Sequence, residues 1–166
     1  MNRIEKGSLL VLAIIVAFNI FFGLGSIPLL DPDEPVYAET AREMIQFNDY
    51  LSPRIYNEYW FDKPPMYYWL VAGAMHVFGD GEFAARFPAA LMAFLTVIML
   101  YCSITRLFNE RTGFWSALVL ATSVQFFYLG KAAVTDTTLL FFLTGSLLCY
   151  FFIRRQMFQH FHMNRR

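Results

Sequence analysis

Hydrophobic and polar positions divide the chain into long uncharged blocks separated by charged segments. The first block, residues 8–30, holds 23 residues. A helix of that length reaches roughly 34 Å at about 1.5 Å per residue, enough to cross a hydrocarbon core of about 30 Å. Three later blocks predict further spans at about residues 87–107, 112–130 and 137–153. The pattern therefore predicts an all-α membrane protein with about four transmembrane helices.

A shorter apolar segment, residues 64–79, decides the topology. Its 16 residues contain His76 and reach only about 24 Å as a helix. If this segment does not cross and the N-terminus lies inside, the outer segments hold eleven of the thirteen acidic residues and the inner segments hold eight of the thirteen basic ones. The positive-inside rule favours this arrangement. We therefore predict an interfacial or re-entrant helix at 64–79, with residues 31–86 and 131–136 outside.

The outer loop, residues 31–86, begins with a predicted amphipathic helix on the membrane surface. Asp33 is expected to cap this helix, with Glu34 and Pro35 in its first turn, and the helix is expected to run to about Phe47. The apolar positions that recur at helical spacing are Tyr37, Ala41, Met44 and Ile45. The polar positions that face elsewhere are Glu39, Arg42, Glu43 and Gln46.

Composition supports a membrane location and removes some functions from consideration. Apolar residues make up 57% of the chain and charged residues 16%, whereas soluble domains have about a quarter charged residues. The formal net charge is zero at pH 7, so nothing indicates a nucleic-acid partner. Cys102 and Cys149 fall inside apolar blocks, which predicts two small buried hydrophobic side chains rather than a disulfide.

Acidic residues gather where the first block ends, at Asp31-Pro32-Asp33-Glu34. Three carboxylates at a membrane surface can bind a divalent cation or accept a proton from a nucleophile. The alternative is a solvated loop that carries a helix cap. The tail offers a second candidate metal site, His160 and His162, but two histidines without carboxylate or thiolate support favour a solvated tail.

Two further segments carry candidate chemistry. In Asp62-Lys63-Pro64-Pro65 the prolines stiffen the backbone, so Lys63 is presented from a rigid loop. A compact ammonium there suits a phosphodiester, and the alternative is interfacial snorkelling. Asp136 lies just outside the last predicted span, five residues after Lys131. It is a second candidate acid, and its alternative role is that of a helix N-cap.

Four motifs in this order carry a resemblance to a known family: Asp33-Glu34-x-x-Tyr37-Ala38-Glu39-x-x-Arg42-Glu43-Met44, Phe61-Asp62-Lys63-Pro64, Glu82-Phe83-Ala84-Ala85-Arg86 and Ala133-Val134-Thr135-Asp136. Together they resemble the N-terminal part of the aminoarabinose transferase and protein mannosyltransferase group of GT-C glycosyltransferases. The resemblance covers residues 1–155. The tail, residues 156–166, lies outside it.

The resemblance implies an enzyme that takes a sugar from a polyprenyl phosphate and transfers it to lipid A, a protein or a glycan. It implies the bacterial inner membrane as the location, with the active-site loop facing the periplasm or exterior. By the same resemblance Asp33 and Asp136 are the catalytic acids and Lys63 contacts the donor phosphate. The other substrate-binding positions that it implies are Glu34, Tyr37, Glu39, Arg42 and Asp62. Metal dependence varies within such families, so a divalent metal stays open.

Two alternatives to a complete enzyme remain at this stage. Members of the group are several times longer, so this chain is expected to be an N-terminal fragment that transfers no sugar alone. It would then be a membrane remnant that binds the lipid-linked sugar or a partner subunit without catalysis. A small transporter subunit is the other alternative, and it predicts ionisable residues inside the spans. Apart from His76 in the doubtful segment, the uncharged blocks 8–30, 87–105, 112–130 and 137–153 contain none.

Overall fold

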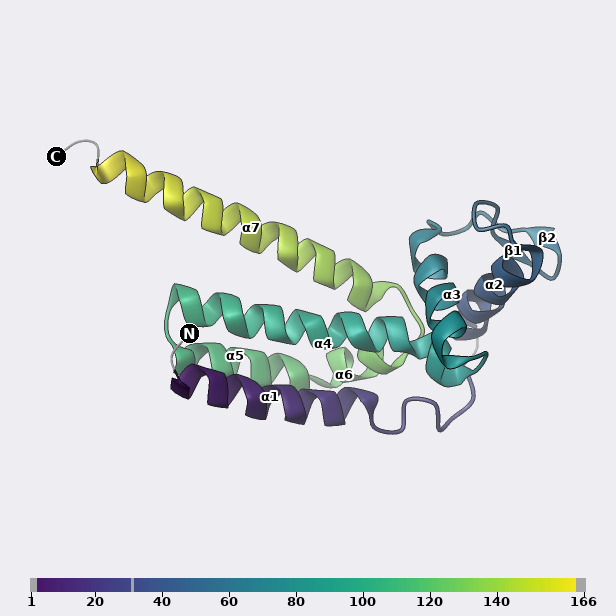
Figure 1. Ribbon diagram of the computed structural model, residues 1–166, viewed down its shortest axis with the longest axis horizontal. Helices are drawn as coiled ribbons and strands as arrows, with labels where there is room; N and C mark the ends of the chain where they lie inside the picture. Colours follow the sequence, from purple (N-terminus) through teal and green to yellow (C-terminus); the bar gives the residue numbers. More distant parts are fainter. Residues whose placement is uncertain (1–2, 31, 164–166) are drawn as a thin grey trace.

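The computed structural model describes the backbone of residues 3–30 and 32–163 and the side chains of residues 5–30 and 32–157. Within these ranges the regular elements are helices apart from one short β-hairpin, which confirms the predicted all-α fold class (Figure 1). The elements are α1 (Arg3–Phe21), α2 (Asp33–Phe47), β1 (Arg54–Ile55), β2 (Glu58–Tyr59), α3 (Met66–Phe78), α4 (Glu82–Leu107), α5 (Glu110–Thr122), α6 (Val124–Lys131) and α7 (Asp136–Met163).

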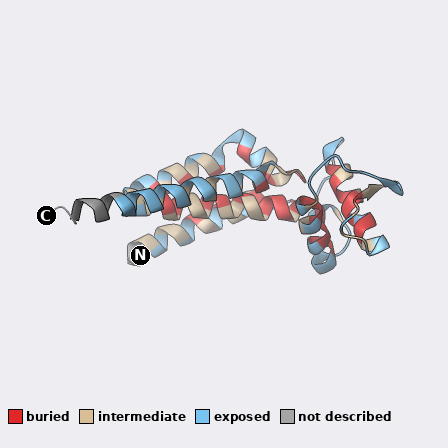
Figure 2. Cartoon of the chain, turned by 90° about the horizontal axis from the view of Figure 1, so that it is seen from above, coloured by how far each residue is buried: buried red, intermediate tan, exposed pale blue. Residues whose placement is uncertain are grey.

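The helices form two regions, which we call the bundle and the head. The bundle consists of α1, α4, α5, α6 and α7, and the head consists of α2, the β-hairpin and α3 at one end of the bundle (Figure 1). Helix α4 is central, because it packs against all the other bundle helices and also against α3. Helix α7 leans away from the others toward its C-terminal end (Figure 1), and most of its surface is exposed (Figure 2).

Two described helices are long and apolar enough to cross a membrane. They are α4, with 26 residues and a mean hydropathy of 2.1, and the part of α7 from Asp136 to Met157, with 22 residues and a mean hydropathy of 1.6. Helices α5 and α6 qualify together as a third, but they are bent by 65° at Ser123. Helix α3 has only 13 residues and lies in the head. That residues 64–79 do not cross the membrane stays a prediction.

The first predicted span, residues 8–30, is helical only as far as Phe21. The chain turns at Gly23, whose φ of +68° suits glycine. The turn is closed by hydrogen bonds from the Leu24 amide to the Phe21 carbonyl and from the Ser26 amide to the Gly23 carbonyl. Residues 24–30 therefore belong to a connection between α1 and α2. The count of four spans and the orientation of the chain stay predictions.

Small residues line the contacts between the bundle helices. Ala90 and Ala93 of α4 and Ala117 and Ala121 of α5 are fully or almost fully buried. Such side chains let helix backbones approach closely, which is how helices associate in lipid. The cysteine prediction is wrong for Cys149, which is exposed because the outer side of α7 has no neighbour, whereas Cys102 is partly buried.

The predicted helix at residues 33–47 is confirmed as α2, with one difference at its start. Pro32 occupies the N-cap position and no side chain caps the helix, so the prediction that Asp33 is the cap is wrong. Asp33 is instead the first helical residue, where its charge still interacts favourably with the helix dipole. Glu34 and Pro35 lie in the first turn, as predicted.

Tyr37, Ala41 and Met44 of α2 are buried, as predicted, but Glu43 is not on the open face. Its side chain is 5% exposed, and both of its carboxylate oxygens accept from the Asn57 amide, at 3.1 and 3.2 Å. Asn57 lies in the two-residue turn between β1 and β2, where Tyr56 and Asn57 both have positive φ values. Glu43 therefore fastens the hairpin to α2.

Candidate functional site

The three charged residues proposed for chemistry lie at the head end of the molecule. Asp33 is the first residue of α2, Lys63 is in the loop before α3, and Asp136 is the first residue of α7 (Figure 1). All three side chains are exposed. Their segments are far apart in the sequence, and α2, α3 and the connection from α6 to α7 bring them to the same end.

Lys63 is held by an acidic neighbour and lies near the start of α2. Its ammonium is 3.4 Å from Oδ2 of Asp62, the residue before it. This contact raises the pKa of Lys63, and the nearby Tyr37 and Asp33 raise it further. Lys63 is therefore a fully charged donor at neutral pH, in electrostatic contact with Asp33. Such a group can exchange its carboxylate partner for a phosphate oxygen.

Glu34, the residue after Asp33, forms a buried ion pair with Arg86. The side chains are 4% and 2% exposed, and two hydrogen bonds join them, Nε to Oε1 at 2.8 Å and Nη2 to Oε2 at 2.7 Å. The Leu30 and Ala133 amides also donate to the Glu34 carboxylate, at 2.7 and 2.6 Å. Burial alone would raise the pKa of Glu34, but these hydrogen bonds outweigh it and lower the pKa below its ordinary value.

Arg86 uses all five of its N–H donors. Besides Glu34 they reach the Leu24, Ile27 and Pro28 carbonyls at 2.8–3.0 Å. The pair thus joins α2 and α4 to the α1–α2 and α6–α7 connections. Glu34 is the neighbour of Asp33, and Ala133 lies three residues before Asp136, so one ion pair fixes both catalytic candidates. Glu34 has no open oxygen for a substrate in this arrangement, although the resemblance had implied substrate binding.

Sequence reasoning gave no role to Arg86. The available signal was an arginine directly beside a predicted span, since a charge entering an apolar environment needs a partner. The partner could not be deduced, because Glu34 lies 52 residues away.

Tyr37 belongs to an aromatic group below the site rather than to its open surface. It is buried, and its ring contacts those of Tyr67 and Tyr68 with centroids at 5.1 and 5.8 Å. Burial raises the pKa of Tyr68 to about 12. It also raises the pKa of Tyr67, with further increases from Tyr37, Glu34 and Asp136. The hydroxyl of Tyr67 makes no hydrogen bond with the described residues.

Glu39 and Arg42 take part in a different cluster. The Arg42 guanidinium pairs with Asp80, Nε to Oδ2 at 2.6 Å and Nη2 to Oδ1 at 3.0 Å, and also with Glu39. The Asp80 contact raises the pKa of Arg42. This cluster links α2 to the turn between α3 and α4. No contact joins it to Asp33 or Lys63 in the described part of the chain, so a substrate role for Glu39 and Arg42 stays a prediction.

The described side chains do not form a metal-binding cluster, so metal dependence stays open. No group of three or more His, Cys, Asp or Glu residues there could hold a metal ion. His76 lies beside Tyr50, with Nε2 3.0 Å from the phenol oxygen. Asp31 of the acidic motif and the tail residues His160 and His162 lie outside the described side chains.

The fold and the charged end together define a helical membrane protein with a polar site at the end of its bundle. The chain belongs to the dolichyl-phosphate-mannose-protein mannosyltransferase family, whose profile matches residues 62–161. Among curated relatives, the undecaprenyl phosphate-alpha-4-amino-4-deoxy-L-arabinose arabinosyl transferase of Yersinia enterocolitica is 33% identical over 155 residues. The transferase of the same name, numbered 2, from Proteus mirabilis is 29% identical over 151 residues.

The solved structures agree with this assignment. The crystal structure of ArnT from Cupriavidus metallidurans in the apo state matches 86% of this chain with a TM-score of 0.80 and 26% identity. The structure of the same protein bound to undecaprenyl phosphate matches equally well. The chain spans about a quarter of these proteins, 28% of the Yersinia relative and 27% of the apo ArnT chain. The GT-C resemblance seen in the motifs is thereby confirmed.

Proposed function

We propose that this chain is part of a glycosyltransferase that takes a sugar from a polyprenyl-phosphate carrier at the outer face of the bacterial inner membrane. The acceptor is lipid A, a protein or a glycan. The observation that carries the proposal is that Asp33, Lys63 and Asp136 are exposed at the head end, where the buried Glu34–Arg86 pair and its bond to the Ala133 amide join the start of α2 to the segment before α7. The undecaprenyl phosphate bound by the ArnT relative supports the class of donor.

In the proposed reaction an acceptor oxygen attacks the anomeric carbon of the donor sugar. Asp33 orients this oxygen and accepts its proton as the new glycosidic bond forms. The bond from the sugar to the carrier phosphate breaks on the opposite side, which inverts the anomeric configuration. Lys63 leaves Asp62 to bind the departing phosphate and stabilises its growing negative charge. Asp136 supports the acceptor side.

Glu34 and Arg86 act in this proposal as positioning residues. Their carboxylate and guanidinium are engaged with each other and with five backbone groups. They keep the start of α2 and the start of α7 at fixed places, and a displacement of about 1 Å at a reacting group can cost roughly a hundredfold in rate.

The proposal is tested in a chimera in which this chain replaces the matching quarter of a full-length relative. Asp33→Asn should lower kcat by about 10²–10⁴ and leave donor affinity nearly unchanged, because a proton acceptor works in the transition state. Lys63→Ala should weaken donor binding by about 1–3 kcal/mol and also lower kcat. Glu58→Gln, which removes an exposed carboxylate from the hairpin, is the matched control and should change neither. A normal single-turnover rate in Asp33→Asn would remove the catalytic assignment.

The proposed orientation is testable in the chain itself. In a variant without Cys102 and Cys149, a cysteine replacing Glu58 should react with an impermeant reagent from outside, and one replacing Glu110 only from inside. Outside labelling at position 110 contradicts the orientation. We also expect the 166-residue chain to bind a polyprenyl-phosphate sugar without turnover, because a site that excludes water needs more walls than these helices provide.

A further inference from the structure

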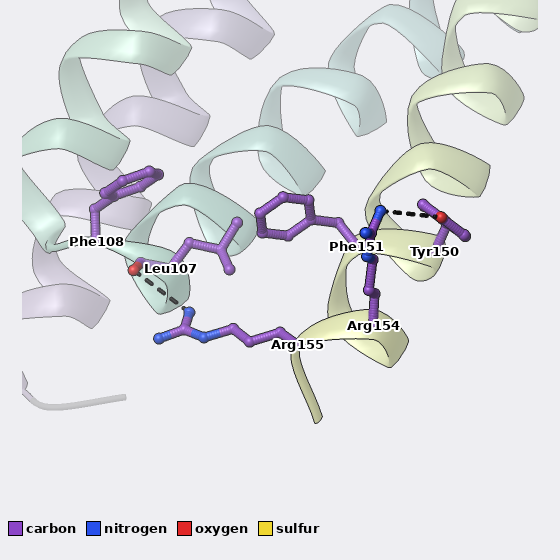
Figure 3. A pocket seen from close by; sticks show the side chains of 6 residues that line it. All are labelled: Leu107, Phe108, Tyr150, Phe151, Arg154 and Arg155. Atoms are coloured by element: carbon purple, nitrogen blue, oxygen red, sulfur yellow. Dashed lines mark hydrogen bonds between the residues drawn. The ribbon is translucent and has the colours of Figure 1, made fainter. Parts of the chain in front are cut away.

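A hollow with an apolar wall and a basic rim lies at the end of the bundle opposite the head. It has a volume of about 510 Å³ and opens between the end of α4 and the C-terminal half of α7 (Figure 3). Its lining residues are Leu107, Phe108, Tyr150, Phe151, Arg154 and Arg155. The volume falls within the range of about 300–1,000 Å³ that is common for small-molecule sites.

The wall is formed by large apolar side chains that the protein leaves uncovered. Phe108 follows the last residue of α4 and is 69% exposed, and Phe151 projects from α7 and is 54% exposed. Leu107 lies between them (Figure 3). In a membrane this surface contacts hydrocarbon, so it fits the upper part of an acyl chain.

The rim carries two guanidinium groups with unused donors. Arg154 donates to the phenol oxygen of Tyr150 at 3.4 Å, and Arg155 donates to the Leu107 carbonyl at 3.5 Å (Figure 3). Neither has a carboxylate partner among the described side chains, unlike Arg42, Arg54 and Arg86. A guanidinium has five N–H donors and binds phosphate in a bidentate manner.

The charge of the rim selects the occupant. In the predicted orientation this end faces the inner leaflet, whose anionic lipids attract basic groups beside a span. We propose that the hollow binds one anionic phospholipid of the inner leaflet. The phosphodiester lies between Arg154 and Arg155, and an acyl chain lies against Phe108 and Phe151. Lipid binding here would hold α7 to α4 at the end where the two helices diverge (Figure 1).

The test measures lipid binding to the purified 166-residue chain in detergent. Phosphatidylglycerol or phosphatidylcholine is titrated in, and binding is followed by native mass spectrometry and by the thermal unfolding temperature. Phosphatidylglycerol should bind and raise that temperature, whereas phosphatidylcholine should have little effect. Arg154→Gln with Arg155→Gln should weaken phosphatidylglycerol binding at least about tenfold, the scale of losing charged hydrogen bonds.

Arg106→Gln with Arg111→Gln is the matched control, because it removes two exposed charges from the same end without touching the hollow. The control should keep normal phosphatidylglycerol affinity, and an equal loss there would overturn the proposal in favour of general charge attraction. Phe151→Ala tests the wall and should weaken binding without changing the preference for phosphatidylglycerol. Equal binding of both lipids also overturns the proposal. So does a dimer in which a second copy of the chain covers the hollow and lipid has no effect.

Discussion

The head and the bundle are stabilised by different kinds of contact. Specific polar contacts connect the segments of the head to one another and to the start of α4, among them Glu34–Arg86, Glu43–Asn57 and Arg42–Asp80, around a core that includes three tyrosines among alanines and methionines. The bundle core consists largely of alanines and aliphatic side chains. One of the polar contacts in that region joins the Tyr101 hydroxyl to the Glu5 carbonyl at 3.0 Å, near the end opposite the head.

This difference follows from what each region must do. Helices in lipid need close backbone approach, which small residues provide at many places, so no single contact dominates. The head lies at one end of the bundle and must hold three separate segments at fixed distances. Directional hydrogen bonds do this with few residues, but each residue is then hard to replace. The effects of substitutions on the free energy of unfolding should therefore differ between the two regions, both in size and in pH dependence.

The largest effect is expected from breaking the ion pair on one side. Arg86→Met leaves the buried Glu34 carboxylate without its positive partner and three backbone carbonyls without their arginine donors, and loss of one partner of such a pair costs about 3–5 kcal/mol. Denaturant unfolding of the chain in detergent, followed by tryptophan fluorescence, measures the loss. Arg106→Met, at an exposed position of the same helix, should cost under about 0.5 kcal/mol. Equal losses would contradict the division between head and bundle.

Acid should weaken the same pair without any substitution. The pKa of Glu34 is lowered in the folded chain from its ordinary value of 4.5. Its contribution to the free energy of unfolding is therefore complete above pH 4.5 and is lost as the pH falls through the folded pKa. Unfolding curves between pH 7 and pH 3 should show this loss, and Glu34→Gln should remove that part of the dependence. Unchanged pH dependence in Glu34→Gln would show that other groups cause it.

Two glycine substitutions, one in each region, allow the packing of the bundle and of the head to be compared. A Cβ at Gly113 of α5 would collide with the Thr105 side chain and lie 3.1 Å from the Tyr101 carbonyl of α4. Gly113→Ala should therefore destabilise the chain by about 1–3 kcal/mol. A Cβ at Gly73 of α3 meets nothing within 4 Å, so Gly73→Ala should stabilise it by about 0.5–1 kcal/mol. Both are read from thermal unfolding, and stabilisation by Gly113→Ala would refute close packing of α4 on α5.

Prediction from the sequence succeeded best for features that depend on neighbouring residues in the chain. The bounds of α2 follow from an amphipathic period that begins after Pro32, and the exposed Lys63 follows from its stiff proline neighbours. The end of α1 at Phe21 was missed because an uncharged block was read as one span, although Gly23, Gly25 and Pro28 are turn formers.

Contacts between distant residues could not be predicted in the same way. Glu34 was recognised as a site residue, but its burial depends on Arg86 and on the Ala133 amide, 99 residues away. Glu43 was placed on the open face because the helical period was considered without the hairpin that covers it. Arg86 belongs to one of the four motifs, but its role came only from the three-dimensional arrangement.

The smallest effect is expected at the surface of the head, at the cluster of Arg42. Arg42→Gln removes an exposed contact to Asp80 and Glu39, and exposed ion pairs contribute about 0–1 kcal/mol because water and salt screen them. Asp80→Asn should cost about the same, and the double variant should cost little more than either single one. Unfolding in low and high salt measures the pair, whose contribution should shrink in high salt while the cost of Arg86→Met barely changes. If Arg42→Gln lowers the free energy of unfolding by about 3 kcal/mol or more, on the scale of a buried pair, then the surface contacts of the head contribute as much to stability as its buried ones.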